Sequence, residues 1–188
     1  MSFLTKLSSK KKELFIVKLL EYILEYQKKH NIKNQCITNV QYFRDSLYFS
    51  GHDVEVKAVI CVRDINGTRF IYTGHLIICL DKDTYIDPSY EFQPVQNNTY
   101  FHSMDEFIKF TKNTTMSEII DKEKLKKQMS NFLNFVKHAN TINNNECIVA
   151  SKNYYNKLAD YVENQMDKLK KTSNINRTLA NKSIIVIK

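Results

Sequence analysis

Three side chains in this sequence could act together as a catalytic group. Cys36 opens a helix-like run, His75 lies inside an apolar segment, and Asp87 directly precedes a proline. In cysteine-dependent acyl transfer a thiol attacks a carbonyl carbon, an imidazole serves as general base and acid, and a carboxylate orients the imidazole. Cys36, His75 and Asp87 are therefore predicted to be the nucleophile, the base and the orienting residue of a catalytic triad.

The thiol is predicted to lie at the start of a helix. Between Cys36 and about Ser50 apolar residues recur at three- and four-residue steps, and Gly51 ends the pattern. The unpaired amides and the dipole of a helix N-terminus favour the thiolate, which is the reactive form of cysteine. The backbone N–H of Cys36 and the side chains of Gln35 or Gln27 are candidate donors to the oxyanion that forms during attack.

The base and the carboxylate are predicted on neighbouring strands of an antiparallel meander. Residues 54–63 and 69–80 are rich in apolar and β-branched side chains, and Asn66-Gly67 between them is a strong hairpin signal. A tight turn at residues 81–83 leads into a third strand at 84–87. The nearly all-apolar middle strand indicates that both faces of the sheet are covered.

The third strand brings Asp87 back toward His75. The two residues are 87 − 75 = 12 positions apart, and folding the strands together puts Asp87 within about two residues of the position opposite His75. Cross-strand neighbours have Cβ atoms roughly 5 Å apart, or about 7–8 Å on a diagonal. A carboxylate at that distance would hold the imidazole in one tautomer and stabilise its protonated form.

The whole pattern predicts one α+β domain over residues 1–188, with an antiparallel sheet packed against helices. Its predicted parts are an N-terminal helix (1–33), the Cys-His-Asp core with the meander (34–100) and a mainly helical portion (101–188). The first helix is predicted to begin at Ser8 or Ser9 and to end near His30.

Capping signals mark the helices of the last portion. Ser103–Glu106 and Thr115–Glu118 both have the spacing of a capping box. A long helix is predicted from Met116 to about His138, followed by an Asn-rich loop at residues 140–145. A last helix is predicted from Ser151 to about Lys171.

Composition sets broader limits. The net charge of +8 comes mostly from Lys residues scattered over amphipathic helices, which indicates solvated helix faces more than a nucleic-acid site and mildly favours an acidic protein partner. No apolar run approaches the roughly 20 residues that span a bilayer, no secretory signal is visible, and four cysteines without a Cys-x-x-Cys pair fit reduced thiols. We expect a soluble intracellular protein with no membrane partner. Its Lys-, Asn- and Ile-rich usage is typical of an AT-rich genome, viral genomes included.

The residues around the triad resemble the transglutaminase-like superfamily, whose core is a circularly related variant of the papain fold. The resemblance covers about residues 34–91, and it rests on the order of Cys, His and Asp, on the junction SGHDVEVKAV and on the segment GHLIICLDKDTYIDPSYE. It implies a papain-like core with Cys36 as nucleophile, His75 as general base and acid, and Asp87 as orienting residue. The chain has no Trp and no Gly beside Cys36, so the resemblance identifies no oxyanion hole.

Two other arrangements use the same histidine and carboxylate. In the order His, Asp, Cys, the residues His75, Asp87 and Cys147 resemble the ubiquitin-like-protein and adenoviral proteases, although the usual Gln before and Gly after the Cys are missing. Cys36, His75 and Asp87 could instead ligate zinc, but no fourth ligand stands at a suitable spacing. We therefore predict neither a metal nor a cofactor.

Together these features predict a cysteine hydrolase that cleaves peptide or isopeptide amide bonds through an acyl-enzyme, with a protein or peptide as substrate. The alternatives are an acyltransferase or transglutaminase on the same triad, and a non-catalytic papain-like scaffold that binds an acidic protein or nucleic acid. The sequence does not indicate the oligomeric state.

Overall fold

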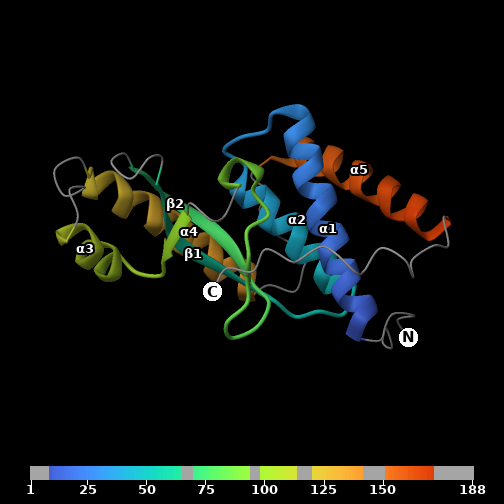
Figure 1. Cartoon of the computed structure of the whole chain (residues 1–188), viewed down its shortest axis with the longest axis horizontal. Coiled ribbons are helices and arrows are strands. Elements are labelled where there is room, and N and C mark those ends of the chain that lie inside the picture. The colour runs from blue at the N-terminus through green and yellow to red at the C-terminus, as the bar shows by residue number, and fades with distance from the viewer. Residues whose placement is uncertain (1–8, 65–69, 94–97, 114–119, 142–150, 172–188) are drawn as a thin grey trace.

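The computed structural model describes residues 9–64, 70–93, 98–113, 120–141 and 151–171. Over these residues the chain is an α+β protein whose C-terminal half is mainly helical, as predicted (Figure 1). Its elements are the helices α1 (Ser9–His30), α2 (Cys36–Phe49), α3 (Met104–Lys112), α4 (Lys122–Thr141) and α5 (Lys152–Lys171), the 3₁₀ turn η1 (Tyr90–Phe92), and the strands β1 (Glu55–Asp64), β2 (Phe70–Cys79), β3 (Tyr85–Ile86) and β4 (Asn98–Phe101). None of these described helices combines the length and the apolar character needed to cross a membrane.

The four described strands form one antiparallel sheet in the order β3-β2-β1-β4. The predicted meander of β1, β2 and β3 is confirmed, although β3 is only two residues long. The sequence pattern does not predict β4, which pairs with the second half of β1 and places Tyr100 opposite Cys61. Across the β1–β2 pair, His75 lies opposite Val59.

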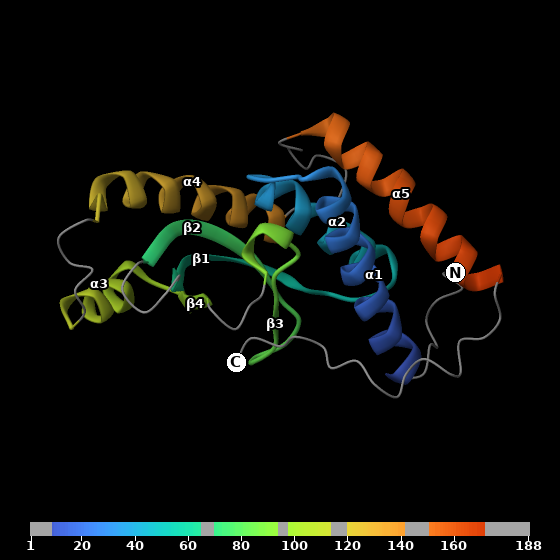
Figure 2. The same ribbon diagram turned by 45° about the horizontal axis from the view of Figure 1, so that its top comes forward.

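Helices cover one face of the sheet and one end of the molecule. In both views α1, α2 and α5 lie together at one end, α3 lies at the other, and α4 runs along β1 and β2 (Figures 1 and 2). The sheet face toward α4 carries buried side chains such as Ile60 and Leu76. Gly74 lets the ring of Phe132 pack directly on β2, because a Cβ at residue 74 would lie 3.1 Å from two carbons of that ring.

Most helix ends agree with the sequence pattern. α1 ends at His30, and α2 begins at Cys36 and stops before Gly51, whose φ of +79° suits a glycine. Ser103 caps α3 by accepting a hydrogen bond from the backbone N–H of Glu106 (3.2 Å). The N-cap predicted at Ser103 is therefore confirmed, but the Glu106 carboxylate accepts the backbone N–H of His102 (2.9 Å), one residue before the one that a capping box uses.

Two predictions in the C-terminal half are wrong. α4 starts later than predicted, at Lys122 rather than Met116. Asp121 is not helical, and its side chain accepts a hydrogen bond from the backbone N–H three residues on (2.9 Å), which caps the helix there. Asn140, predicted in a loop, belongs to α4, and its carboxamide bonds the backbone N–H and carbonyl of Val56 (3.0 and 3.1 Å).

Three predicted features lie outside the described residues. They are the turn at Asn66-Gly67, the capping box at Thr115–Glu118, and the alternative nucleophile Cys147. Within the described part, the β1–β2 ladder ends at the pair of Asp64 and Phe70.

The burial of α2 yields the first prediction. Phe43 is fully buried in the core, whereas Phe49 on the same helix keeps 69% of its surface exposed. Phe43→Ala should lower the free energy of unfolding by about 3–5 kcal/mol, because it leaves a cavity. Phe49→Ala should cost less than about 0.5 kcal/mol. Urea unfolding of the two variants measures both values, and equal losses would contradict this packing of α2.

Candidate active site

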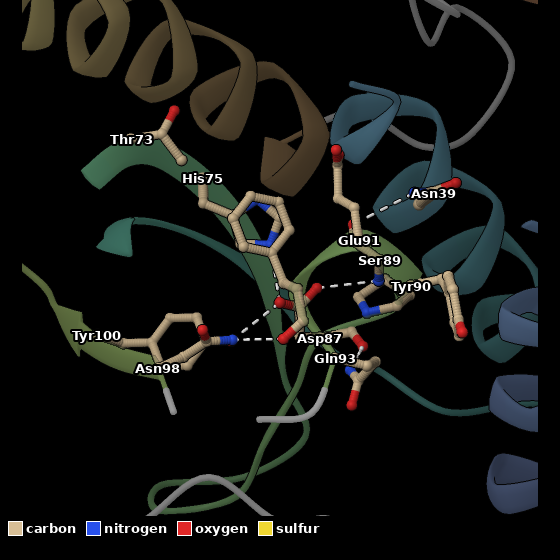
Figure 3. A network of polar contacts seen from close by, with 12 residues as sticks. Asn39, Thr73, His75, Asp87, Ser89, Tyr90, Glu91, Gln93, Asn98 and Tyr100 are labelled. Atoms are coloured by element: carbon tan, nitrogen blue, oxygen red, sulfur yellow. Dashed lines mark hydrogen bonds and ion pairs between the residues drawn. The ribbon is translucent and has the colours of Figure 1, made fainter. Parts of the chain in front are cut away.

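The structure brings His75 and Asp87 into contact. Because Ile86 pairs with Ile78, Asp87 lies diagonally across from His75 on the neighbouring strand. The His75 Nε2 lies 2.9 Å from the Asp87 Oδ2 (Figure 3), and only 1% and 3% of the two residues' surfaces are exposed. The contact expected from the hairpin is present.

Two further donors hold the Asp87 carboxylate. The backbone N–H of Ser89 donates to Oδ1 (2.9 Å), and the hydroxyl of Tyr100 donates to Oδ2 (3.0 Å), so Asp87 lies between His75 and Tyr100 (Figure 3). A buried carboxylate is stable only when its oxygens are hydrogen-bonded or paired. Tyr100 is not predicted from the sequence, because it lies on β4, which the sequence pattern does not predict. The only signal was the short β-forming run Asn98–Phe101.

Cys36 completes the predicted set. It is the first residue of α2, it is half-buried, and it lines the same cleft as His75. The Nε2 of the imidazole is hydrogen-bonded to Asp87, so Nδ1 is the ring nitrogen that can interact with the thiol. The cysteine is also close enough to contribute to the pKa of His75. The structure therefore places the three predicted residues side by side.

Burial and charge act in opposite directions on His75. Burial lowers the pKa of the imidazole, while the charge and hydrogen bond of Asp87, followed by those of Cys36, raise it. The net effect raises the pKa of His75 from 6.5 to about 10. Asp87 therefore keeps the ring protonated at neutral pH, which provides a cation next to the thiol.

A cleft of about 410 Å³ gives access to this group. The ring of Phe92 packs against the His75 imidazole, with the ring centroids 4.0 Å apart and the ring planes tilted by 33°. On the α4 side, Phe132 and Gln128 line the cleft, and the Gln128 Oε1 accepts the backbone N–H of Gly74 (2.9 Å). The cleft thus lies between η1 and α4.

The two glutamines predicted as oxyanion donors have different outcomes. Gln27 is buried, donates from Nε2 to the carbonyl of Pro88 (2.7 Å), and accepts the backbone N–H of Tyr90 at Oε1 (2.9 Å). Its carboxamide is thus engaged in holding the segment after β3, and the prediction is wrong for Gln27. Gln35 directly precedes α2 and accepts a hydrogen bond from the Thr38 hydroxyl (3.4 Å), which leaves its amide nitrogen as a candidate donor.

Asn39 joins the elements that carry the triad. From its place in α2, its Nδ2 donates to the Gln27 Oε1 and to the Ser89 Oγ, each at 3.2 Å. Its Oδ1 accepts the hydroxyl of Tyr154 in α5 (2.7 Å). The helix that begins with the thiol is thereby fixed to the segment that begins with Asp87. No local sequence pattern identifies Asn39, because its partners are distant in the chain.

The described residues contain no group of three or more His, Cys, Asp or Glu side chains placed to hold a metal ion.

The raised pKa of His75 predicts a pH dependence of stability. Below about pH 6.5 the folded and unfolded states both hold the proton, and between about 6.5 and the folded pKa only the folded state does. The stabilising contribution is therefore present at low pH and is lost as the pH rises through the folded pKa. One bound proton corresponds to a loss of up to about 1.4 kcal/mol per pH unit.

Urea unfolding between about pH 6.5 and 7.5 would measure this slope, below the range in which the thiol of Cys61, whose pKa burial raises to about 12, begins to contribute through its ionisation in the unfolded state. His75→Gln should reduce the decline relative to the unsubstituted protein. His138→Gln, at an exposed histidine, is the matched control and should leave the slope unchanged. The same slope in all three proteins would show that His75 holds no extra proton in the folded state.

Comparison of the chain with protein-family models, with curated proteins and with solved structures finds no match in any of the three.

Proposed function

We propose that this protein is a cysteine hydrolase that cleaves peptide or isopeptide amide bonds, and that its core is papain-like, of the transglutaminase-like kind. The observation that carries the proposal is the buried contact between His75 and Asp87 beside a cleft that Cys36 also lines. Cysteine-dependent acyl transfer requires a nucleophile next to a base, and a carboxylate that orients the base.

The proposed reaction begins with the thiolate of Cys36 attacking the carbonyl carbon of the substrate. His75 is the protonated partner of that thiolate, and it donates its proton to the leaving amine as the C–N bond breaks. A thioester between Cys36 and the acyl group remains. Neutral His75 then removes a proton from water, the hydroxide attacks the thioester, and the carboxylic acid and the thiol are released.

Asp87 has two roles in this scheme. Its bond to Nε2 fixes the ring so that Nδ1 faces the thiol, and its negative charge stabilises the imidazolium. Ser89 and Tyr100 keep the carboxylate in place by donating to its two oxygens. Because it touches Asp87 rather than the substrate, Tyr100 is a positioning residue.

The first turn of α2 supplies donors for the oxyanion. The first amides of a helix have no partner within the helix, and the first i to i−4 bond of α2 is the one from Asn39 N–H to Gln35 carbonyl (2.9 Å). The backbone N–H of Cys36 is therefore available at the point where the tetrahedral oxyanion would form. The side-chain amide of Gln35 is a second candidate.

Alkylation by iodoacetamide tests the nucleophile. At about pH 6 an ordinary thiol is only about 0.3% thiolate, so a Cys36 thiolate paired with imidazolium should react at least about tenfold faster than Cys79 in the same chain and, because burial raises the pKa of Cys79, also at least about tenfold faster than free cysteine. His75→Gln should remove this advantage, and His138→Gln should keep it. Mass spectrometry identifies the alkylated residue.

Two results of this experiment would count against Cys36. If it reacts no faster than Cys79 and is indifferent to His75→Gln, the group is a non-catalytic scaffold. If rapid labelling survives Cys36→Ser and disappears with Cys147→Ser, then the nucleophile is Cys147.

Peptide cleavage tests the reaction itself. The protein is incubated with a mixture of unstructured peptides of varied sequence, and new peptide ends are identified by mass spectrometry. We expect new carboxyl termini with the unsubstituted protein and none with Cys36→Ser. Products in which an added amine has replaced the leaving group would assign the protein to acyl transfer instead of hydrolysis.

A further inference from the structure

Arg63 brings a positive charge into the cleft beside the triad. It lies on β1, four residues after Val59, which faces His75 across the β1–β2 ladder. Side chains four residues apart on a strand share a face, so Arg63 and His75 lie on the same face of the sheet. Both residues line the cleft that contains Cys36.

Two contacts hold the guanidinium in place. The Arg63 Nε donates to the Asn98 Oδ1 (3.0 Å), and the guanidinium carbon lies 5.5 Å from the centroid of the Phe92 ring. The same ring packs against His75, so the guanidinium and the imidazole lie on the same side of the cleft. Asn98 is itself fixed, because its Nδ2 donates to the Tyr100 hydroxyl (3.3 Å). Arg63 is thus held by the network that orients the base.

One end of this arginine has no partner within the described part of the chain. Its Nη2 is buried and makes no hydrogen bond there, and no carboxylate of the described residues lies within ion-pairing distance of the guanidinium. Glu91 lines the same cleft, but its Oε1 accepts the backbone N–H of Asn34 (2.8 Å). Because Nη2 is itself buried, a ligand in the cleft would meet another edge of the guanidinium, and it is the positive charge without a paired carboxylate in the cleft wall that favours an anionic ligand here.

We propose that Arg63 binds a carboxylate of the substrate, so that the protein acts on acyl substrates with a carboxylate close to the scissile bond. This inference rests on the proposed function, because it places the carboxylate relative to the carbonyl that Cys36 attacks. The guanidinium is suited to the role, since its planar N–H groups match the two oxygens of a carboxylate. The carboxylate belongs either to an acidic side chain or to the C-terminus of a peptide.

A pair of small reagents measures the preference at Cys36 without a known substrate. Iodoacetate and iodoacetamide react in the same way: the sulfur forms a bond to the CH₂ carbon and iodide leaves. They differ in carrying a carboxylate or a neutral carboxamide. The quantity of interest is the ratio of the two alkylation rates at Cys36, because the ratio cancels any general change in thiol reactivity.

Arg63→Gln should lower the ratio of iodoacetate to iodoacetamide rates by about tenfold, the effect of losing one charge-assisted hydrogen bond. The imidazolium of His75 also attracts anions, and its share of the preference remains in this variant. Lys57→Gln is the matched control, since Lys57 is a cation on the same strand about 20 Å away. It should leave the ratio unchanged.

Competition with two isomeric compounds tells the sources of the carboxylate apart and needs no variant. N-acetylisoglutamine has only a side-chain carboxylate, and N-acetylglutamine has only a terminal carboxylate. Each is added to the unsubstituted protein, and the protection of Cys36 from iodoacetamide is measured. Stronger protection by the first supports an acidic side chain, and stronger protection by the second supports a peptide C-terminus.

The possible failures are distinct. Rapid alkylation at about pH 6 with a ratio that Arg63→Gln does not change overturns the role of Arg63 and leaves the proposed function standing. If neither isomer protects Cys36, the role of Arg63 is likewise overturned and the proposed function stands. This result can be obtained even if Arg63→Gln does not fold, because it needs only the unsubstituted protein. Slow alkylation by both reagents contradicts the thiolate–imidazolium pair, and the carboxylate inference falls with it.

Discussion

The buried negative charge of Asp87 is the constraint on which the rest of this site depends. A carboxylate removed from water must be compensated by donors and by a cation, or it becomes protonated. Here the compensation comes from three separate segments: the imidazole of His75 on β2, the backbone N–H of Ser89, and the hydroxyl of Tyr100 on β4. This requirement raises the pKa of His75 and brings the segment after β3 and the strand β4 into contact with one carboxylate.

The buried side chain of Asn39 connects the helix that carries the thiol to the segment that carries Asp87. Asn39 lies one turn after Cys36 on α2 and bonds both Gln27 and Ser89, while Gln27 bonds the backbone on either side of Ser89. These side chains are buried, so each broken bond would leave a donor or acceptor without water. The distance between the thiol and the imidazole is thus set by satisfied polar groups between the helices and the sheet, in addition to the apolar core.

Local signals in the sequence were sufficient for some parts of this structure and not for others. The contact of His75 with Asp87 follows from a hairpin of nearly fixed register, and Cys36 follows from a helix with clear start and stop signals, so both could be predicted. β4 is four residues long and its partner is β1, more than thirty positions earlier, so neither the strand nor Tyr100 has a local signature. The bonds of Gln27 could not be predicted either, because its partners at Pro88 and Tyr90 lie more than sixty positions later and meet it only in the folded chain.

The same sheet face carries both the chemistry and the charge of the cleft. From His75 a continuous set of hydrogen bonds runs through Asp87, Tyr100 and Asn98 to Arg63. Because side chains alternate along a strand, a slip of one residue between β1 and β2 would turn Arg63 toward α4 and put its neighbour Val62 in the cleft. The apolar residues packed under α4 prevent such a slip, since it would bring polar groups into the core. The packing that stabilises the sheet therefore also determines that His75 and Arg63 face the same cleft.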